Sequence, residues 1–231
     1  MADLPEDFSA HLARTLAILR ESMRDVEHLI QKNRIFYDRM RGTGIIAAHD
    51  AIALSFTGPV LRSAGVNYDV RKATPYLVYD RLDFEVPLGE QGDNYDRYLV
   101  RMEEIRQSTR MVEQCMAYMP EGPVQLDDAR MTMPPKAEVY GTIEGMMNHF
   151  KLIIEGIKPP PGEVYFPVEG ANGELGFYLI SDGTGRPYRC RVRPPCFTLM
   201  QGLQKMLKGG MVADIVATFG TINMIAGEND R

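Results

Sequence analysis

The chain has 231 residues, of which 45% are hydrophobic and 25% charged, and its formal net charge is -5. This composition supports a folded core and excludes a disordered or collagen-like chain. The acidic balance and the absence of a long Lys/Arg block exclude the clustered cations that a nucleic-acid groove needs. No nucleic acid is therefore expected as a partner.

The hydropathy of the sequence argues against a membrane-spanning helix. The most apolar stretch, from Ile45 to Phe56, is interrupted by His49 and Asp50, whereas a spanning helix needs about 20 apolar residues in succession. We therefore expect no direct membrane span. The first residues, 1–7, are acidic where a secretory signal would be basic and then apolar, which favours a cytoplasmic location.

Three long helices are predicted from apolar residues that recur every three or four positions. The first runs from Phe8 to Ile30, the second from about Asp93 to Met119, and the third from roughly Thr142 to Ile157. Between the first two, residues 41–92 are rich in Gly, Pro and Tyr. This composition predicts short helices and irregular chain. A connection this long with so little regular structure is usually functional or packed against something else.

After the proline triplet at 159–161 the apolar period changes to two, which predicts three short strands at 163–168, 174–180 and 188–192. Two further helices are expected at 197–207 and 211–219. The predicted fold is mainly α with a small antiparallel β element. Its helical body covers residues 1–158 and 195–231, and the β insert covers 162–193.

Searches for chemistry in the sequence are mostly negative. The four histidines show no paired metal-ligand spacing, and no motif for a nucleophile or a nucleotide loop is complete. Cys115, Cys190 and Cys196 are odd in number and contain no C-x-x-C pair, so we expect reduced, buried structural cysteines without a disulfide. No catalytic residue and no metal site are predicted.

Two charged patterns remain. Arg189, Arg191 and Arg193 alternate on a predicted strand, so they share one face that either binds carboxylates of a neighbour or is simply solvated. In the second predicted helix, charges of both signs follow Asp93 at helical spacing. This pattern favours ion pairs along or between helices.

Several long runs carry a family resemblance: Arg62–Val66, Asp69–Tyr76, Asp83–Pro87, Gly92–Tyr98, Arg101–Ser108, His149–Lys151, Ser181–Gly183 and Arg186–Cys190. With these runs the chain resembles the C-terminal half of the D-type subunit, also called the 49 kDa-type subunit, of NADH:quinone oxidoreductase (respiratory complex I). The resemblance covers almost the whole chain. By this resemblance the N-terminal part of the family, with the His and Tyr that grip the quinone headgroup, is missing.

The resemblance implies a fold like the helical bundle of the nickel-iron hydrogenase large subunit. It also implies a role in forming the cavity where quinone, the substrate, is reduced beside the terminal iron-sulfur cluster of a partner subunit, with electron transfer from NADH coupled to ion translocation. By the same resemblance this chain binds no cofactor of its own, and NADH, FMN and the iron-sulfur clusters belong to other complex I subunits. The location implied is peripheral, on the cytoplasmic side of the inner (cell) membrane.

Residue by residue, the resemblance assigns Ile225 and Asp230 to the border of the quinone cavity. It also exposes two departures, since Gly210 stands where His is common and Ala226 where a bulky aromatic is common. Two alternatives stay open. One is the large subunit of a related membrane-bound hydrogenase-like complex, which the absence of cysteine from residues 227–231 disfavours; the other is a truncated structural or assembly module.

Overall fold

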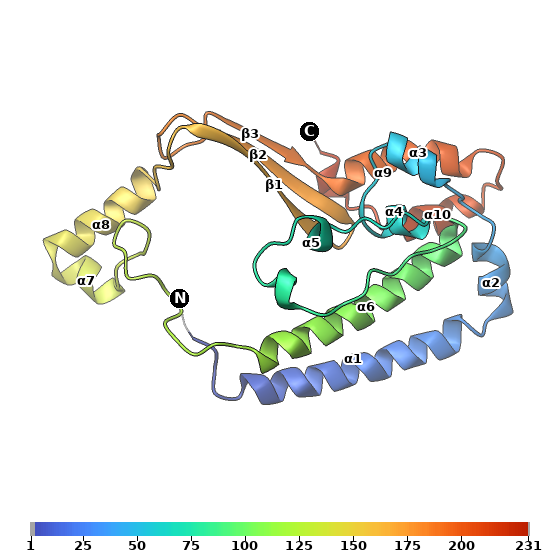
Figure 1. Cartoon of the computed structure of the whole chain (residues 1–231), viewed down its shortest axis with the longest axis horizontal. Coiled ribbons are helices and arrows are strands. Elements are labelled where there is room, and N and C mark those ends of the chain that lie inside the picture. Colours follow the sequence, from blue (N-terminus) through green and yellow to red (C-terminus); the bar gives the residue numbers. More distant parts are fainter. Residues whose placement is uncertain (1–2, 231) are drawn as a thin grey trace. The chain divides into compact units, whose positions relative to one another are not determined.

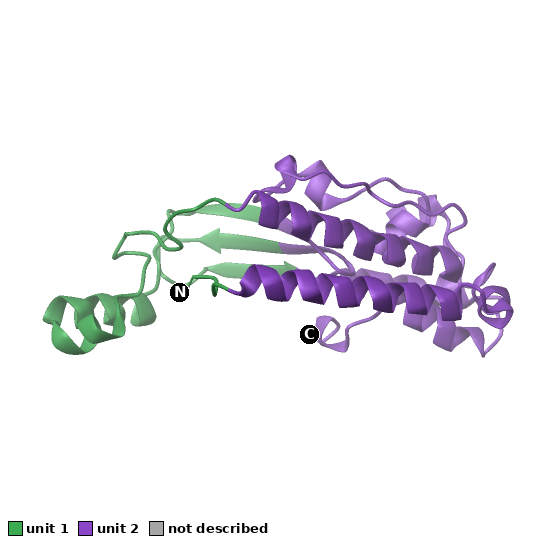
Figure 2. Ribbon diagram, turned by 90° about the horizontal axis from the view of Figure 1, so that it is seen from below, with its two compact units in different colours: residues 1–6, 120–166, 177–192 green, residues 7–119, 167–176, 193–231 purple. Residues whose placement is uncertain are grey.

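The computed structural model describes residues 3–230, and its contacts divide the chain into two compact units, which Figure 2 colours separately. Unit 1 comprises Met1–Glu6, Pro120–Phe166 and Phe177–Val192, and unit 2 comprises Asp7–Met119, Pro167–Gly176 and Arg193–Arg231. Helices dominate, and one three-stranded sheet accompanies them (Figure 1). The predicted class, mainly α with a small antiparallel β element, is confirmed.

Unit 2 contains most of the helices. They are α1 (Phe8–Ile30), α2 (Arg34–Met40), α3 (Ala48–Ala53), α4 (Gly58–Ser63), α5 (Val70–Ala73), α6 (Asn94–Ala117), α9 (Pro195–Leu207) and α10 (Asp214–Ile222), with short 3-10 turns η1 (Tyr79–Arg81) and η2 (Ala226–Glu228). The predicted bounds of α1 are confirmed. Helix α6 starts after Asp93, whose carboxylate caps it by accepting from the backbone N–H of Asp96 at 2.8 Å.

Helices α1 and α6 run side by side in both views (Figure 1, Figure 2). Of the apolar stripe predicted on α1, Leu16 and Met23 are buried. The charges between the apolar positions form the expected ion pairs: Arg20 of α1 lies 2.5 Å from Glu113 of α6, and Glu27 pairs with Arg106. The ion pairs predicted from the charge pattern of the second helix are thus confirmed between helices.

The largest core of unit 2 joins α3, α4, α9 and α10. Its buried members are Ile46, Ala51, Phe56, Val60, Leu61, Leu199, Met206 and Ile222. Helix α9 can approach this core closely because Gly202 has no side chain: a β-carbon placed there would lie 2.1 Å from Cζ of Phe56. The Phe56 ring therefore packs directly on the backbone of α9.

The sheet is built from β1 (Gly162–Gly170), β2 (Gly173–Ser181) and β3 (Arg189–Arg193) in the order β1-β2-β3. The turn that joins β1 to β2 belongs to unit 2, where Gly173 packs against Gly58 at the start of α4. A β-carbon on Gly58 would lie 2.3 Å from Cα of Gly173, and both glycines have positive φ. Only glycine at both positions permits this contact.

Unit 1 contains α7 (Lys136–Gly141) and α8 (Ile143–Ile154), which pack against each other. Helix α7 was not predicted, because six residues after a proline pair are too few to show a helical period. Helix α8 ends at Ile154, earlier than predicted, and Thr142 caps it by accepting from the N–H of Gly145 at 3.0 Å. Gly145 is the one buried residue of α8 in the described chain.

Two expectations from the sequence are corrected. Helix α10 spans Asp214–Ile222 rather than 211–219, because the Asp214 carboxylate accepts from the N–H of Met211 at 2.9 Å and closes a turn ahead of the helix. Of the three cysteines, only Cys196 is buried; Cys115 and Cys190 are exposed. All three are free thiols, as expected.

Across residues 3–230, α1 and α6 included, the structure offers no helix with both the length and the apolarity needed to traverse a bilayer.

The contact between Gly202 and Phe56 can be tested by substitution. We expect Gly202→Ala to lower the free energy of unfolding by about 1–3 kcal/mol, because the added methyl group displaces the Phe56 ring. Gly220→Ala is the matched control, since Gly220 lies in α10 with no atom within 4 Å of its missing β-carbon. This control should raise the free energy of unfolding by about 0.5–1 kcal/mol through helix propensity. Urea denaturation measures both changes, and equal effects would contradict the packing described.

Candidate functional site

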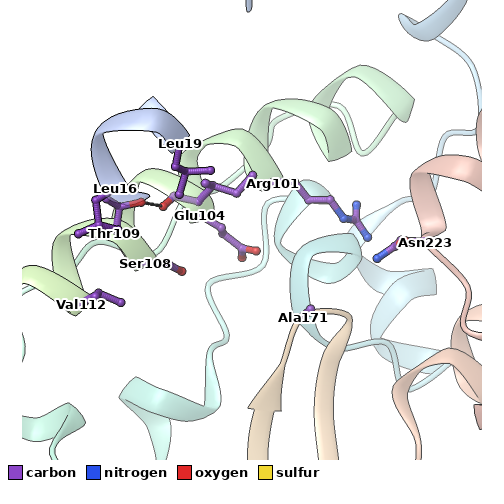
Figure 3. Close-up of a pocket in the computed structure, with 10 residues that line it drawn as sticks. Leu16, Leu19, Arg101, Glu104, Ser108, Thr109, Val112, Ala171 and Asn223 are labelled. Carbon is purple, nitrogen blue, oxygen red and sulfur yellow. Dashed lines mark hydrogen bonds between the residues drawn. The ribbon is translucent and has the colours of Figure 1, made fainter. Parts of the chain in front are cut away.

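A pocket of about 380 Å³ lies within unit 2 between α1 and α6 (Figure 3). Its walls are mainly apolar, with Leu16 and Leu19 from α1 facing Ile105 and Val112 of α6. The remaining lining residues are polar or small: Arg101, Glu104, Ser108, Thr109, Ala171 and Asn223. Apolar walls with a few polar groups are typical of ligand sites.

Arg101 lies at one end of the pocket, where Figure 3 shows its side chain extending toward Asn223. One nitrogen, Nη2, donates to the carbonyl of Ile222 at 3.1 Å. The other, Nη1, is buried and has no hydrogen-bond partner among residues 3–230. Burial lowers the pKa of Arg101, while the neighbouring Glu104 raises it. The arrangement leaves a cationic donor ready for an acceptor.

Behind Glu104 lies a buried cluster of charges around Arg62, whose side chain is 1% exposed. Its Nε donates to Glu104 at 2.8 Å, its Nη1 donates to Glu169 at 2.9 Å, and Asp69 lies 3.5 Å away. Asp69 is in turn bound by Arg71 through Nε at 2.9 Å and Nη2 at 2.5 Å. One guanidinium thus joins α4, α6, the start of α5 and strand β1.

The pKa values of this cluster follow from its composition of three carboxylates and two guanidiniums. Burial raises the pKa of Glu169 above its usual range, and Asp69 adds to this against the opposing effect of Arg62. For Asp69 burial is outweighed by the hydrogen bond from Arg71 and the charge of Arg62, so its pKa is lowered. For Arg62 the three carboxylates outweigh burial and raise the pKa. The cluster holds one more acid than base, and Glu169 bears the excess.

A second buried arginine, Arg97, connects the start of α6 with the end of α10. It donates to the carbonyls of Gly92 at 2.9 Å and Gly44 at 2.6 Å, and to the hydroxyl of Thr221 at 3.1 Å. Burial, with a smaller contribution from the charge of Arg101, lowers the pKa of Arg97 to about 10. This arginine fixes the place where the chain leaves α10.

The C-terminal segment, residues 223–230, begins at this place. Asn223 has a left-handed backbone with φ of 58°, the geometry that ends a helix. Ile225 is 49% exposed, and Asp230 is exposed beyond the η2 turn. Neither residue lines the pocket between α1 and α6, but Asn223 does, so the pocket and the segment share a border.

Comparison with known proteins identifies the relatives of the chain. All of it, residues 1–231, matches the family described as respiratory-chain NADH dehydrogenase, 49 kDa subunit. The chain belongs to this family. It is 55% identical over 229 residues to the D-type subunit of NADH-quinone oxidoreductase from Myxococcus xanthus, covering 99% of this chain and 55% of that protein. It is also 56% identical over 226 residues to the first D-type subunit of the same enzyme from Sorangium cellulosum, covering 97% of this chain and 56% of that protein.

A third relative, the C/D-type subunit of NADH-quinone oxidoreductase from Bdellovibrio bacteriovorus, is 49% identical over 229 residues, which are 99% of this chain and 41% of that protein. The chain therefore spans about half the length, or less, of these relatives. The family resemblance stated from the sequence is confirmed. The names of the relatives are those of an oxidoreductase complex component.

In this member of the 49 kDa subunit family, the three arginines predicted to share one face of a strand lie on β3 and differ in exposure. Arg189 and Arg191 are exposed, as the solvated-face alternative predicts. Arg193 is half-buried and donates to the carbonyls of Glu174 at 2.6 Å and Ser55 at 2.8 Å. Within residues 3–230 no group of three or more His, Cys, Asp or Glu side chains is arranged to hold a metal ion.

Sequence reasoning missed the residues that organise this site. Arg62 and Glu104 lie in runs that carry the family resemblance, yet nothing in the sequence marked them as an ion pair. Glu169 and Asn172 had no signal beyond a strand and its turn. The one signal in the sequence is local: Arg62 directly follows the apolar residues Val60 and Leu61. An arginine beside apolar residues in a short helix can indicate a buried guanidinium.

The charge cluster leads to a stability prediction. Arg62→Met leaves Asp69, Glu104 and Glu169 without their shared cation, and we expect a loss of about 3–5 kcal/mol in the free energy of unfolding near neutral pH. Unpaired buried carboxyls have raised pKa values, so they bind protons in the folded state as the pH falls. The loss should therefore shrink at acidic pH.

The control is Arg34→Met. Arg34 also pairs with a carboxylate, that of Asp38 at 3.3 Å, but its side chain is 92% exposed and the pair lies on the surface. This change should leave the free energy of unfolding nearly unchanged at every pH. Denaturant unfolding of both variants across a pH series gives the comparison. A loss for Arg62→Met that does not vary with pH would contradict the role given to the three carboxylates.

Proposed function

We propose that this chain is the part of a D-type subunit of NADH:quinone oxidoreductase that helps form the quinone-reduction cavity beside the terminal iron-sulfur cluster. The observation that carries the proposal is the family match over the whole chain, with relatives named as D-type subunits of NADH-quinone oxidoreductase. In this proposal the chain supports electron transfer from NADH to quinone coupled to ion translocation. The chain supplies a wall of the cavity and no electron carrier.

The proposal extends to partners and location. NADH, FMN and the iron-sulfur clusters belong to other complex I subunits, of which the one that carries the terminal cluster packs on this chain. The assembly lies peripherally on the cytoplasmic side of the membrane. The proposed fold is that of the nickel-iron hydrogenase large subunit, with the helical body at 1–158 and 195–231 and the β insert at 162–193.

The proposed wall of the cavity is the C-terminal segment, residues 223–230, with Ile225 and Asp230 as the residues nearest quinone. Apolar side chains are exposed just before α10, along it and in this segment: Val212 is 85%, Val216 is 79% and Ile225 is 49% exposed. A quinone ring and its apolar chain bind to walls of this kind. The exposed carboxylate of Asp230 adds an acceptor at the end of the segment.

Ile225→Lys tests this assignment in membranes where the enzyme is assembled with the variant subunit. We expect roughly a tenfold or larger loss in kcat/KM for a short-chain quinone, because a cation replaces apolar surface in a pocket that must exclude water. The rate of hexacyanoferrate reduction by NADH should be unchanged. Hexacyanoferrate takes electrons from the flavin, before they reach quinone. Assembled enzyme is quantified from its flavin content.

Ile35→Lys is the matched control, since Ile35 is a 74% exposed isoleucine on α2, away from the C-terminal segment. It should leave quinone reduction per assembled enzyme unchanged. If Ile225→Lys also leaves both kcat and KM for quinone unchanged, the C-terminal segment does not border the quinone cavity. If the variant prevents assembly altogether, Ile225→Val supplies the graded change, with an expected two- to threefold shift in roughly the same direction.

A further inference from the structure

The C-terminal segment is held in place by hydrogen bonds from the turn between β1 and β2. Asn172, which is 2% exposed, occupies this turn. Its amide Nδ2 donates to the backbone carbonyl of Asn223 at 2.9 Å, and its Oδ1 accepts from Nδ2 of Asn223 at 2.9 Å. The two asparagines therefore form a reciprocal pair at the first residue of the segment.

The same amide reaches a second element. Nδ2 of Asn172 also lies 3.4 Å from Sγ of Cys196, in the first turn of α9, and this sulfur accepts from the N–H of Ile225 at 3.4 Å. The N–H of Cys196 donates to the Glu228 carboxylate at 2.8 Å. Asn172, directly and through Cys196, thus holds the chain on both sides of the exposed Ile225 side chain.

Burial makes the loss of the hydrogen bonds to the Cys196 sulfur costly. Cys196 is 0% exposed, so its sulfur has no water to replace the donors from Asn172 and Ile225. Burial raises the pKa of the Cys196 thiol, and a hydrogen bond to Glu228 raises it further. The thiol stays neutral, so the contacts that Asn172 and the N–H of Ile225 make with its sulfur involve no formal charge; the Glu228 carboxylate is the charged group of this cluster.

The position of the turn is itself fixed. The N–H of Glu174 donates to Oγ1 of Thr57 at 3.0 Å, and Glu169 at the end of β1 is bound by buried Arg62. The close contact between Gly58 and Gly173 leaves the turn no room to shift toward α4. Asn172 therefore projects from a rigid support.

We propose that Asn172 is a positioning residue for quinone reduction, which holds residues 223–230 so that Ile225 and Asp230 border the cavity. This inference rests on the proposed function, and it adds a residue outside the segment that the family resemblance singles out. Asn172 acts through Asn223 and Cys196 and does not itself touch quinone.

The test uses Asn172→Ala in the assembled, membrane-bound enzyme, with kcat and KM measured for a short-chain quinone. We expect KM to rise roughly tenfold, because small misplacements of a binding wall are costly. Electron transfer from NADH to hexacyanoferrate, per flavin, should be unchanged. Asn223→Gly is a milder second variant, since glycine keeps the left-handed backbone while only the Nδ2 donor is lost; its KM should rise about two- to threefold.

Two controls separate positioning from stability. Leu82→Ala removes a buried side chain from the second core cluster of unit 2, so it should lower the amount of assembled enzyme while KM for quinone stays within about twofold. Asn67→Ala changes an exposed asparagine between α4 and α5 and should alter neither quantity.

The outcomes distinguish the inference from the proposed function. A raised KM for both asparagine variants, with Leu82→Ala unchanged, supports the positioning role. If Ile225→Lys impairs quinone reduction while Asn172→Ala and Asn223→Gly leave KM and kcat unchanged, the positioning role is wrong and the proposed function stands. If all three leave quinone kinetics unchanged, the segment is not a cavity wall, and both ideas fail.

Discussion

The buried guanidinium of Arg62 is the constraint around which unit 2 is organised. It binds Glu104 of α6 and Glu169 of β1, and it lies beside Asp69 at the start of α5. Burying four charged groups is costly in itself, so such a cluster contributes less to net stability than to the choice of one arrangement. Because Glu104 also lines the pocket and Glu169 leads into the β1–β2 turn, a single side chain sets the pocket wall and the turn relative to each other.

Helix α6 carries this organisation along one face. Arg97, Arg101 and Glu104 follow one another at helical spacing, and each reaches a different part of the unit: the loop around Gly44, the end of α10 at Ile222, and Arg62. The three contacts lie within two turns of helix. The point where the chain leaves α10 is therefore fixed from α6 on one side and from Asn172 on the other.

How much of this was visible in the sequence depends on whether the determining contacts are local. The bounds of α1, the start of α6 near Asp93 and the three strands follow from periodicity and turn residues, which act over a few positions. Helix α7 escaped notice because six residues hold no full apolar period. Arg62 and Glu169 are separated by 107 positions, and Asn172 and Asn223 by 51, so no local pattern records that they meet. Ile225 and Asp230 entered only through family resemblance, since an exposed isoleucine in a tail has no physical signature of its own.

The two kinds of clamp in unit 2 suit different tasks. Around Arg62 the contacts are ionic, and their strength depends on which carboxyls hold protons. Near the proposed cavity wall, the contacts between Asn172 and Asn223 and the contacts to the Cys196 sulfur are between neutral groups, whereas the N–H of Cys196 donates to the Glu228 carboxylate. In the proposed function quinone takes up electrons and protons beside this wall, so the charge next to it changes during turnover. Neutral hydrogen bonds respond far less to such changes than ion pairs do. In the proposed role, the neutral contacts of Asn172 and Asn223, anchored on the ionic cluster deeper in the unit, would hold Ile225 in one place while the charge next to it changes.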